Sequence, residues 1–250
     1  MKSIWVITLL GALVLLAFVA AGSAEAPLPE TENGIAVIEL FTSQGCSSCP
    51  SADKVLQEIN KQAKDSGKKV YALSMHVDYW NYLGWKDPYS SETLTQRQRE
   101  YGSAFGLRSI YTPQMIINGN VEFVGSRSGQ AKAEVEKALS QAPQYNLAIT
   151  RNSVDNGKIN WDAQQKFSGT LNLAVVRVKA DNDVPRGENR GRKLSHNNVV
   201  MAFSSSSVNS SNGMVNIPEF TELSGESYEL VAYLQESGKK VVGAAALPLL

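Results

Sequence analysis

Cysteine and histidine are scarce in this chain, with two of each among 250 residues. Two cysteines exclude a dense disulfide framework and any zinc site built from four cysteines. An excess of one charge is also missing, because 24 basic side chains balance 24 acidic ones. Dedicated nucleic-acid binders normally carry a basic excess, so we expect no nucleic-acid partner. The hydrophobic content of 43% is that of a globular protein, not of a disordered or collagen-like chain.

Common catalytic and nucleotide-binding signatures are absent too. The sequence contains no phosphate loop, no dinucleotide fingerprint, no HExxH and no GxSxG. The sequence therefore predicts neither a nucleotide-binding site nor a hydrolase site of these types, and no cofactor is expected.

The N-terminus has the pattern of an export signal. Lys2 precedes a run without charge from Ile4 to Ala21, and small residues follow it. This order predicts a secretory signal peptide over residues 1–24 and a linker over residues 25–34. The alternative is an uncleaved membrane anchor, since about 18 mostly apolar residues can just span a bilayer. We expect a periplasmic or secreted protein, in a compartment where disulfides persist, with membrane contact only through an uncleaved signal.

Strand-like and helical segments alternate from residue 35 to residue 143. Ile35–Phe41 is a mostly apolar run, typical of a strand buried on both faces. The following segments are a helix at Ser51–Lys64, a strand at Val70–Met75, a helix at Ser91–Phe105, a hairpin of Gln114–Ile117 and Val121–Val124, and a helix through Ala131–Ala142. This β-α-β-α-β-β-α order predicts an α/β domain in which helices cover a mixed sheet.

No helical period remains after Pro143. Seven short β-rich runs follow instead: Leu147–Val154, Lys158–Asp162, Leu171–Ala180, Asn198–Ser204, Met214–Ile217, Tyr228–Gln235 and Lys240–Leu247. They predict an all-β, antiparallel, sandwich-like domain over residues 144–250. The serine-rich segment Ser204–Ser211 is expected to be a loop. The basic segment Arg186–Arg192 is interpreted as a solvated connection, with anion binding or docking against the first domain as alternatives.

Both cysteines occur in one motif, Cys46-Ser47-Ser48-Cys49-Pro50, between the first predicted strand and the first predicted helix. Sulfurs three positions apart on a first helical turn can join in a small ring without moving the backbone. The unpaired N–H groups and the dipole of a helix start favour a thiolate there. This predicts a redox pair in which Cys46 is the more exposed nucleophile and Cys49 resolves a mixed disulfide. A static structural disulfide is the alternative, although so short a ring gains little chain entropy.

A proline enters the predicted hairpin. Pro113 follows Thr112 and immediately precedes the strand Gln114–Ile117, where proline removes a donor from the ladder. A cis Thr112–Pro113 bond facing the sulfurs would explain its position. Together with the cysteine motif at a strand–helix junction, this order resembles the thioredoxin superfamily. In that family a cis-proline lies beside the active disulfide and the residue before it offers backbone groups to the substrate, which implies substrate-binding roles for Thr112 and Pro113.

A narrower resemblance covers roughly residues 35–250. The strings that carry it are IELFTSQGCSSCPSADK, HVDYWNYLGWKDP, YTPQMIING and GENRGRKLSHNNVV. They look like the bacterial secreted thioredoxin-like family of unknown function DUF1223. That family brings no established activity with it.

Three polar residues are candidates for tuning the cysteines. His76 and Asp78 end the second predicted strand, near the expected helix-start chemistry, where they can shuttle protons. Glu39, inside the apolar first strand, is a candidate proton acceptor for Cys49. The alternatives are a hydrogen-bonded structural histidine, a turn carboxylate and a carboxylate facing the sheet edge. Five nearby aromatic residues either wall a peptide-binding groove or pack an insertion: Tyr79, Trp80, Tyr82, Trp85 and Tyr89.

These features predict an exported thiol–disulfide oxidoreductase that exchanges disulfides with protein substrates. Because the chain has no third cysteine, recycling requires an external redox partner. The two serines between the cysteines do not indicate the direction of electron flow. One alternative is a copper-binding chaperone with Cys46, Cys49 and His76 as ligands. The other is a non-catalytic interaction module with a structural disulfide.

Overall fold

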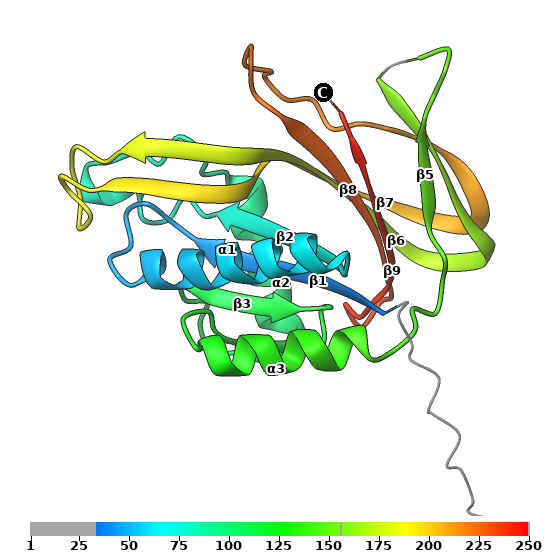
Figure 1. Ribbon diagram of the computed structural model, residues 1–250, viewed down its shortest axis with the longest axis horizontal. Helices are drawn as coiled ribbons and strands as arrows, with labels where there is room; N and C mark the ends of the chain where they lie inside the picture. The colour runs from blue at the N-terminus through cyan, green and yellow to red at the C-terminus, as the bar shows by residue number, and fades with distance from the viewer. Residues whose placement is uncertain (1–33, 156, 250) are drawn as a thin grey trace, which may run out of the picture. The chain divides into compact units, whose positions relative to one another are not determined.

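The computed structural model describes residues 34–155 and 157–249. The predicted signal peptide and nearly all of the predicted linker lie outside these residues. The first part of the chain contains β1 (Ile35–Thr42), α1 (Cys49–Ser66), β2 (Lys69–His76), the 3-10 helix η1 (Asn81–Leu83), α2 (Glu92–Ala104), β3 (Gln114–Ile117), β4 (Val121–Val124) and α3 (Ser128–Leu139) (Figure 1). The predicted order of strands and helices is confirmed. No helix in the described ranges is long and apolar enough to cross a membrane.

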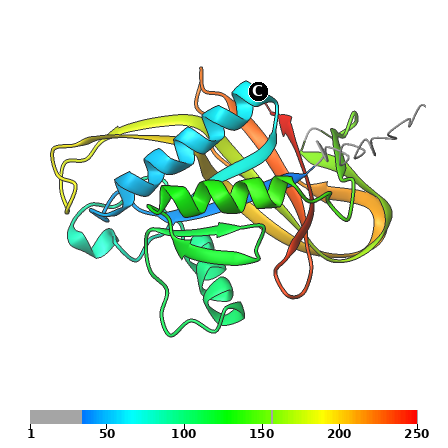
Figure 2. The same cartoon turned by 60° about the horizontal axis from the view of Figure 1, so that its bottom comes forward.

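β1 is the central strand of the first part. It pairs in parallel with β2 and antiparallel with β3, which forms a hairpin with β4. Alternate side chains of β1 point to opposite faces of the sheet. Ile38 and Leu40 pack with α1 and α3, which lie side by side in Figure 2, while Val37 and Phe41 join a core shared with α2. Both faces of β1 are therefore buried, which explains its apolar sequence.

The helix α1 carries one of the two cysteines at its first residue. Pro50 occupies its first turn, where the missing N–H costs no helical hydrogen bond. Apolar side chains at helical spacing hold it against β1. Gly67 ends it in the left-handed conformation at φ 66° and donates its N–H to the last turn.

The second part is built from β5 (Ala148–Arg151), β6 (Lys158–Asp183), β7 (Lys193–Asn216), β8 (Tyr228–Gln235) and β9 (Val241–Pro248). These strands pair antiparallel with one another, as predicted. The prediction of seven short strands is wrong, because two pairs of the predicted runs each belong to one long strand. β6 has 26 residues and β7 has 24.

The serine-rich segment Ser204–Ser211 is part of β7 and not a loop. Its residues Ser204–Ser210 pair with Leu173–Phe167 of β6. Serine has little preference for strands, but the alternating apolar side chains of β6 fix the ladder and override local propensity. Register shifts after Asp162 and after Val175 mark β-bulges, which bend a strand of this length.

A single residue pair, Ser74–Val199, joins β2 to β7 and so connects the two parts. The resulting sheet has the order β4-β3-β1-β2-β7-β6-β8-β9, with β5 beside β6. Side chains of β8 and β9 share a core with β1, β2 and α2, and the second part has a further core of its own. The predicted fold class, an α/β part followed by an antiparallel β part, is confirmed. Its division into two domains at residue 143 stays a prediction.

Glu39 lies in the core between the two parts and faces neither the sheet edge nor solvent. It is 1% exposed, and Arg97 of α2 binds both carboxylate oxygens at 2.5 and 3.0 Å. The hydroxyls of Tyr101 and Tyr233 also donate to it. All the hydrogen bonds of its side chain thus go to α2 and β8. The edge-facing interpretation is wrong, and nothing in these contacts connects Glu39 with Cys49.

Candidate functional site

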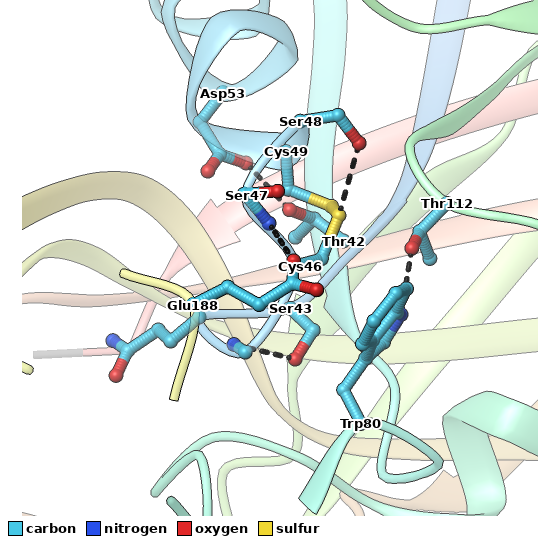
Figure 3. The surroundings of a disulfide bond; sticks show 12 residues. Thr42, Ser43, Cys46, Ser47, Ser48, Cys49, Asp53, Trp80, Thr112 and Glu188 are labelled. Atoms are coloured by element: carbon cyan, nitrogen blue, oxygen red, sulfur yellow. Dashed lines mark hydrogen bonds between the residues drawn. A yellow bond between two sulfur atoms is a disulfide. The ribbon is translucent and has the colours of Figure 1, made fainter. Parts of the chain in front are cut away.

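The two cysteines form a disulfide in the turn between β1 and α1 (Figure 3). Their Cα atoms are 5.4 Å apart. The turn is held by backbone hydrogen bonds from Cys46 N to Ser43 O and from Cys49 N to Cys46 O, both 3.2 Å. The Cys46 residue is 1% exposed and Cys49 is fully buried, whereas Ser47 and Ser48 face solvent. Cys46 lies just before the helix and Cys49 is its first residue, but both are buried, so the expected exposure of Cys46 is not seen.

The Thr112–Pro113 peptide bond is cis, as predicted. It precedes β3, and Figure 3 shows Thr112 among the residues around the disulfide. Trp80 donates its indole N–H to the Thr112 hydroxyl at 2.8 Å. Trp80 also packs on the cysteine turn, since a Cβ added to Gly45 would lie 3.0 Å from Trp80 Cβ. The aromatic ring therefore connects the cysteine turn to the residue before the cis-proline.

Asp53 is a functional candidate that the sequence analysis missed. It lies four residues after Cys49, which places both side chains on one face of α1, and it is buried. Its Oδ1 accepts a hydrogen bond of 2.9 Å from the Thr42 hydroxyl at the end of β1. Burial raises the pKa of Asp53 to about 6, against the opposing effects of the His76 charge and the Thr42 hydroxyl. Its carboxyl can therefore exchange a proton near neutral pH.

His196 of β7 faces Asp53 from the second part of the chain. Its Nδ1 lies 3.5 Å from Asp53 Oδ2. Trp85 donates to Gln44 Oε1, which leaves the Gln44 amide N–H₂ to donate to His196 Nε2 at 3.3 Å. Burial lowers the pKa of His196 to about 3, with a contribution from the charge of His76. The ring is therefore neutral, and its proton is on Nδ1, towards Asp53.

The predicted tuning residues His76 and Asp78 have structural partners. His76 Nδ1 lies 2.7 Å from Asp87 Oδ2. Burial alone would lower the pKa of His76, but the Asp87 carboxylate outweighs it and the net shift is upward. Asp78 interacts with Thr95 at the start of α2, accepting from its hydroxyl at 2.6 Å. His76 still belongs to the site, because its ring is 4.7 Å from the ring of His196.

The aromatic segment is mostly packed into the structure. Tyr79 donates to Gln98, Trp80 to Thr112, Trp85 to Gln44 and Tyr89 to Asn182. Tyr82 is the exception, at 79% exposed. These contacts support the packing alternative for four of the five aromatic residues.

The basic segment Arg186–Arg192 docks on the cysteine turn and is not a solvated connection. Asn189 is fully buried and donates to the carbonyl oxygens of Gln44 and Cys46, each at 2.9 Å. Glu188 accepts a hydrogen bond of 2.9 Å from the Ser47 N–H. The docking alternative is thus confirmed, and the second part of the chain contributes directly to the surroundings of the disulfide.

The structure does not assemble the alternative copper site. Within the described ranges, no three side chains of histidine, cysteine, aspartate or glutamate converge where they could hold a metal. His76 points its Nδ1 at Asp87, as described above. Its pairing is with a carboxylate and not with the two sulfurs.

Comparisons with known proteins agree with this geometry. A family described as proteins of unknown function, DUF1223, matches residues 37–235. A thioredoxin of Methanocaldococcus jannaschii is 32% identical over 100 residues, which cover 40% of this chain and 91% of that protein.

Two solved structures share the fold over most of the chain. A crystal structure of a protein from Agrobacterium tumefaciens is similar with a TM-score of 0.64 and 27% identity, over 86% of this chain and 95% of that one. HBP35 of Porphyromonas gingivalis is similar with a TM-score of 0.56 and 12% identity, over 86% and 75% of the two chains. The second likeness bears on the fold alone.

Proposed function

Because the chain belongs to the DUF1223 family of proteins of unknown function and contains a thioredoxin-like region, we propose that it exchanges disulfides with protein substrates. Cys46 and Cys49 are the proposed catalytic residues. The observation that most supports this is Asp53, a buried carboxyl one helical turn after Cys49 whose pKa is raised to about 6. A disulfide that only fixes the turn has no use for a proton acceptor.

The proposed reaction starts from the dithiol form. The Cys46 thiolate attacks one sulfur of a substrate disulfide, forms a mixed disulfide and releases the other substrate sulfur as a thiolate. The Cys49 thiol then gives its proton to Asp53 and attacks the Cys46 sulfur. This closes the Cys46–Cys49 bond and releases the second substrate thiolate, so two electrons pass from the protein to the substrate. The reverse sequence oxidises a substrate dithiol, and an external redox partner resets the pair.

Thr112 and Pro113 are the proposed substrate contacts. This role is implied by the thioredoxin likeness, in which the residue before the cis-proline binds an extended substrate segment. The Trp80 indole N–H donates a hydrogen bond to the Thr112 hydroxyl at 2.8 Å. Trp80 would thereby hold the substrate-binding loop in place. Export to the periplasm or the medium is a further proposal, which rests on the signal-like residues 1–24.

The first test replaces the cysteines one at a time. Cys46→Ser should abolish the reduction of insulin disulfides, because no thiolate remains to attack the substrate. Cys49→Ser should instead accumulate mixed disulfides between Cys46 and substrates, because the resolving thiol is gone. Lys54→Ser is a matched control, since it places a serine at an exposed position of the same helix and keeps both sulfurs. Activity of Cys46→Ser equal to that of the control would contradict the proposal.

A structural disulfide is the second candidate function, and the burial of both cysteines favours it. The reduction potential separates the two. Structural disulfides typically have potentials below about −300 mV, whereas catalytic pairs lie above this value. A potential below that limit, together with thiols that fail to react, would support the structural candidate.

A further inference from the structure

A carboxylate from the second part of the chain lies on the amide next to Cys46. Glu188 Oε2 accepts the Ser47 N–H at 2.9 Å, although the two residues are 141 positions apart (Figure 3). Glu188 belongs to the β6–β7 loop, Val184–Arg192. The contact is thus made only when the loop docks on the cysteine turn.

The docked position of Glu188 is fixed by its neighbours. Asn189 anchors the loop through its two hydrogen bonds to the cysteine turn, and Arg192 donates to Asn189 Oδ1 at 2.8 Å, which orients the amide. Gly187 and Gly191 flank this anchor with φ of 78°, a conformation that favours glycine. Because the anchor is buried, Glu188 has a defined place although its own side chain is exposed.

The position of the Glu188 carboxylate affects how readily Cys46 ionises in the reduced protein. A thiolate at Cys46 is stabilised by the unpaired N–H groups at the start of α1 and by the positive end of the helix dipole. Glu188 accepts the Ser47 N–H of the turn just before the helix, and so adds a negative charge beside the residue that must become an anion. The hydrogen bond from the Ser47 backbone, with one from its side chain, lowers the pKa of Glu188, so the carboxylate stays ionised at neutral pH.

Other charged and titratable groups form a cluster that begins at Asp53, one helical turn after Cys49. Asp53 approaches from α1, His76 from β2 and His196 from β7, and Asp87 pairs with His76. The arginines of the loop, Arg186, Arg190 and Arg192, are exposed. Of these groups, only Glu188 is hydrogen-bonded to the amide that follows Cys46.

We propose that Glu188 opposes ionisation of the Cys46 thiol in the reduced protein and thereby makes the dithiol a stronger reductant. The inference rests on the proposed redox function and gives it a direction. In the favoured reaction the dithiol loses two electrons and two protons, the Cys46–Cys49 bond forms, and a substrate disulfide is cleaved to two thiols. Glu188 acts through Cys46 and does not touch the substrate.

The test measures thiolate formation at Cys46 against pH by ultraviolet absorbance. In the Cys49→Ser background Cys46 is the only thiol, because the chain has two cysteines. Glu188→Gln should increase the acid ionisation constant of Cys46 by about 1.5- to 5-fold, the range of a single exposed charge interaction. Glu188→Lys should increase it further. Both increases should shrink in about 1 M salt, where the screening length is about 3 Å.

A matched control removes one carboxylate charge from α1, farther from Cys46. Glu58→Gln alters an exposed carboxylate nine residues after Cys49, about 13 Å further along α1, and should leave the ionisation constant unchanged. In the two-cysteine protein, Glu188→Gln should also shift the equilibrium with glutathione towards the dithiol at pH 8. Equal values for Glu188→Gln, Glu188→Lys and the parent at low salt would overturn the inference. So would equal increases for Glu188→Gln and Glu188→Lys that salt does not change, since these would report only a displaced loop.

The two proposals fail separately. A charge-dependent shift at Cys46 in a protein that reduces no substrate disulfide would remove the proposed function and keep the role of Glu188. Insulin reduction without any charge-dependent shift would keep the function and remove the role of Glu188.

Discussion

Replacing Arg97 by methionine should lower the free energy of unfolding by about 3–5 kcal/mol. The substitution leaves the Glu39 carboxylate buried in the shared core without its cation. The guanidinium also lies 4.7 Å from the ring of Phe203 and 5.0 Å from that of Tyr101, so these contacts with α2 and β7 are lost as well. Urea unfolding of the oxidised protein measures the loss.

Two further variants show whether the charge is responsible. Arg97→Met/Glu39→Gln removes both charges and should recover a large share of the lost stability. Burying an uncharged amide costs much less free energy than burying a carboxylate. Lys61→Met breaks the ion pair with Asp65 on the surface of α1 and should have almost no effect. If Arg97→Met costs less than about 1 kcal/mol, Glu39 is not a buried anion in the folded protein.

Asp53→Asn should have two opposite effects. Exchange should slow by about 10²-fold or more, because Cys49 loses its proton acceptor and general-base catalysis typically contributes that much. The folded state should become more stable at pH 7, by about 3 kcal/mol. This figure follows from the difference between the folded pKa of about 6 and the ordinary value of 3.8.

The pH dependence follows from the sign of the shift. The pKa of Asp53 is higher in the folded protein than in the unfolded chain, so the folded state binds the proton first as the pH falls. The parent should therefore gain stability between about pH 6 and pH 4, relative to Asp53→Asn. Urea unfolding at several pH values measures this difference. Asp65→Asn, on the exposed side of the same helix, is the control and should change neither the rate nor this profile.

An Asp53→Asn protein that exchanges disulfides at the parent rate would exclude Asp53 as the proton acceptor. A variant that is slower but no more stable would indicate that Asp53 is not destabilising at pH 7. The two readouts therefore test the catalytic role and the raised pKa independently.

The parts of the site that follow one another in sequence could be predicted. The cysteine motif lies at a strand–helix junction, and the proline before β3 is cis, because local backbone constraints leave clear signals there. The order of the α/β elements was also readable from hydrophobic periodicity. Asp53 could have been found the same way, as the one carboxylate on the buried face of α1 near Cys49.

The parts of the site that come from the second half could not be predicted from local pattern. Glu188 and Asn189 reach the cysteine turn, and His196 reaches Asp53, only because β7 pairs with β2 and the loop before β7 folds back. The three arginines of the segment Arg186–Arg192 predicted a solvent-exposed loop. The position of that loop is instead fixed by Asn189, which is buried. The lengths of β6 and β7 could not be predicted for a related reason. Pairing with β6 keeps the serine-rich part of β7 in a strand, although serine has little preference for strands.

The sequence distance between Ser47 and Glu188 has a consequence for the nascent chain. Ribosomes add about 5–20 residues per second, so the 141 positions between them take about 7–28 s to synthesise. During that interval Cys46 and Cys49 exist without Glu188, Asn189 and His196. We expect the pair in the growing chain to ionise more readily than the pair in the finished protein, and to be a weaker reductant. The same two sulfurs thus have one chemistry while the polypeptide is growing and another after its last strands have docked.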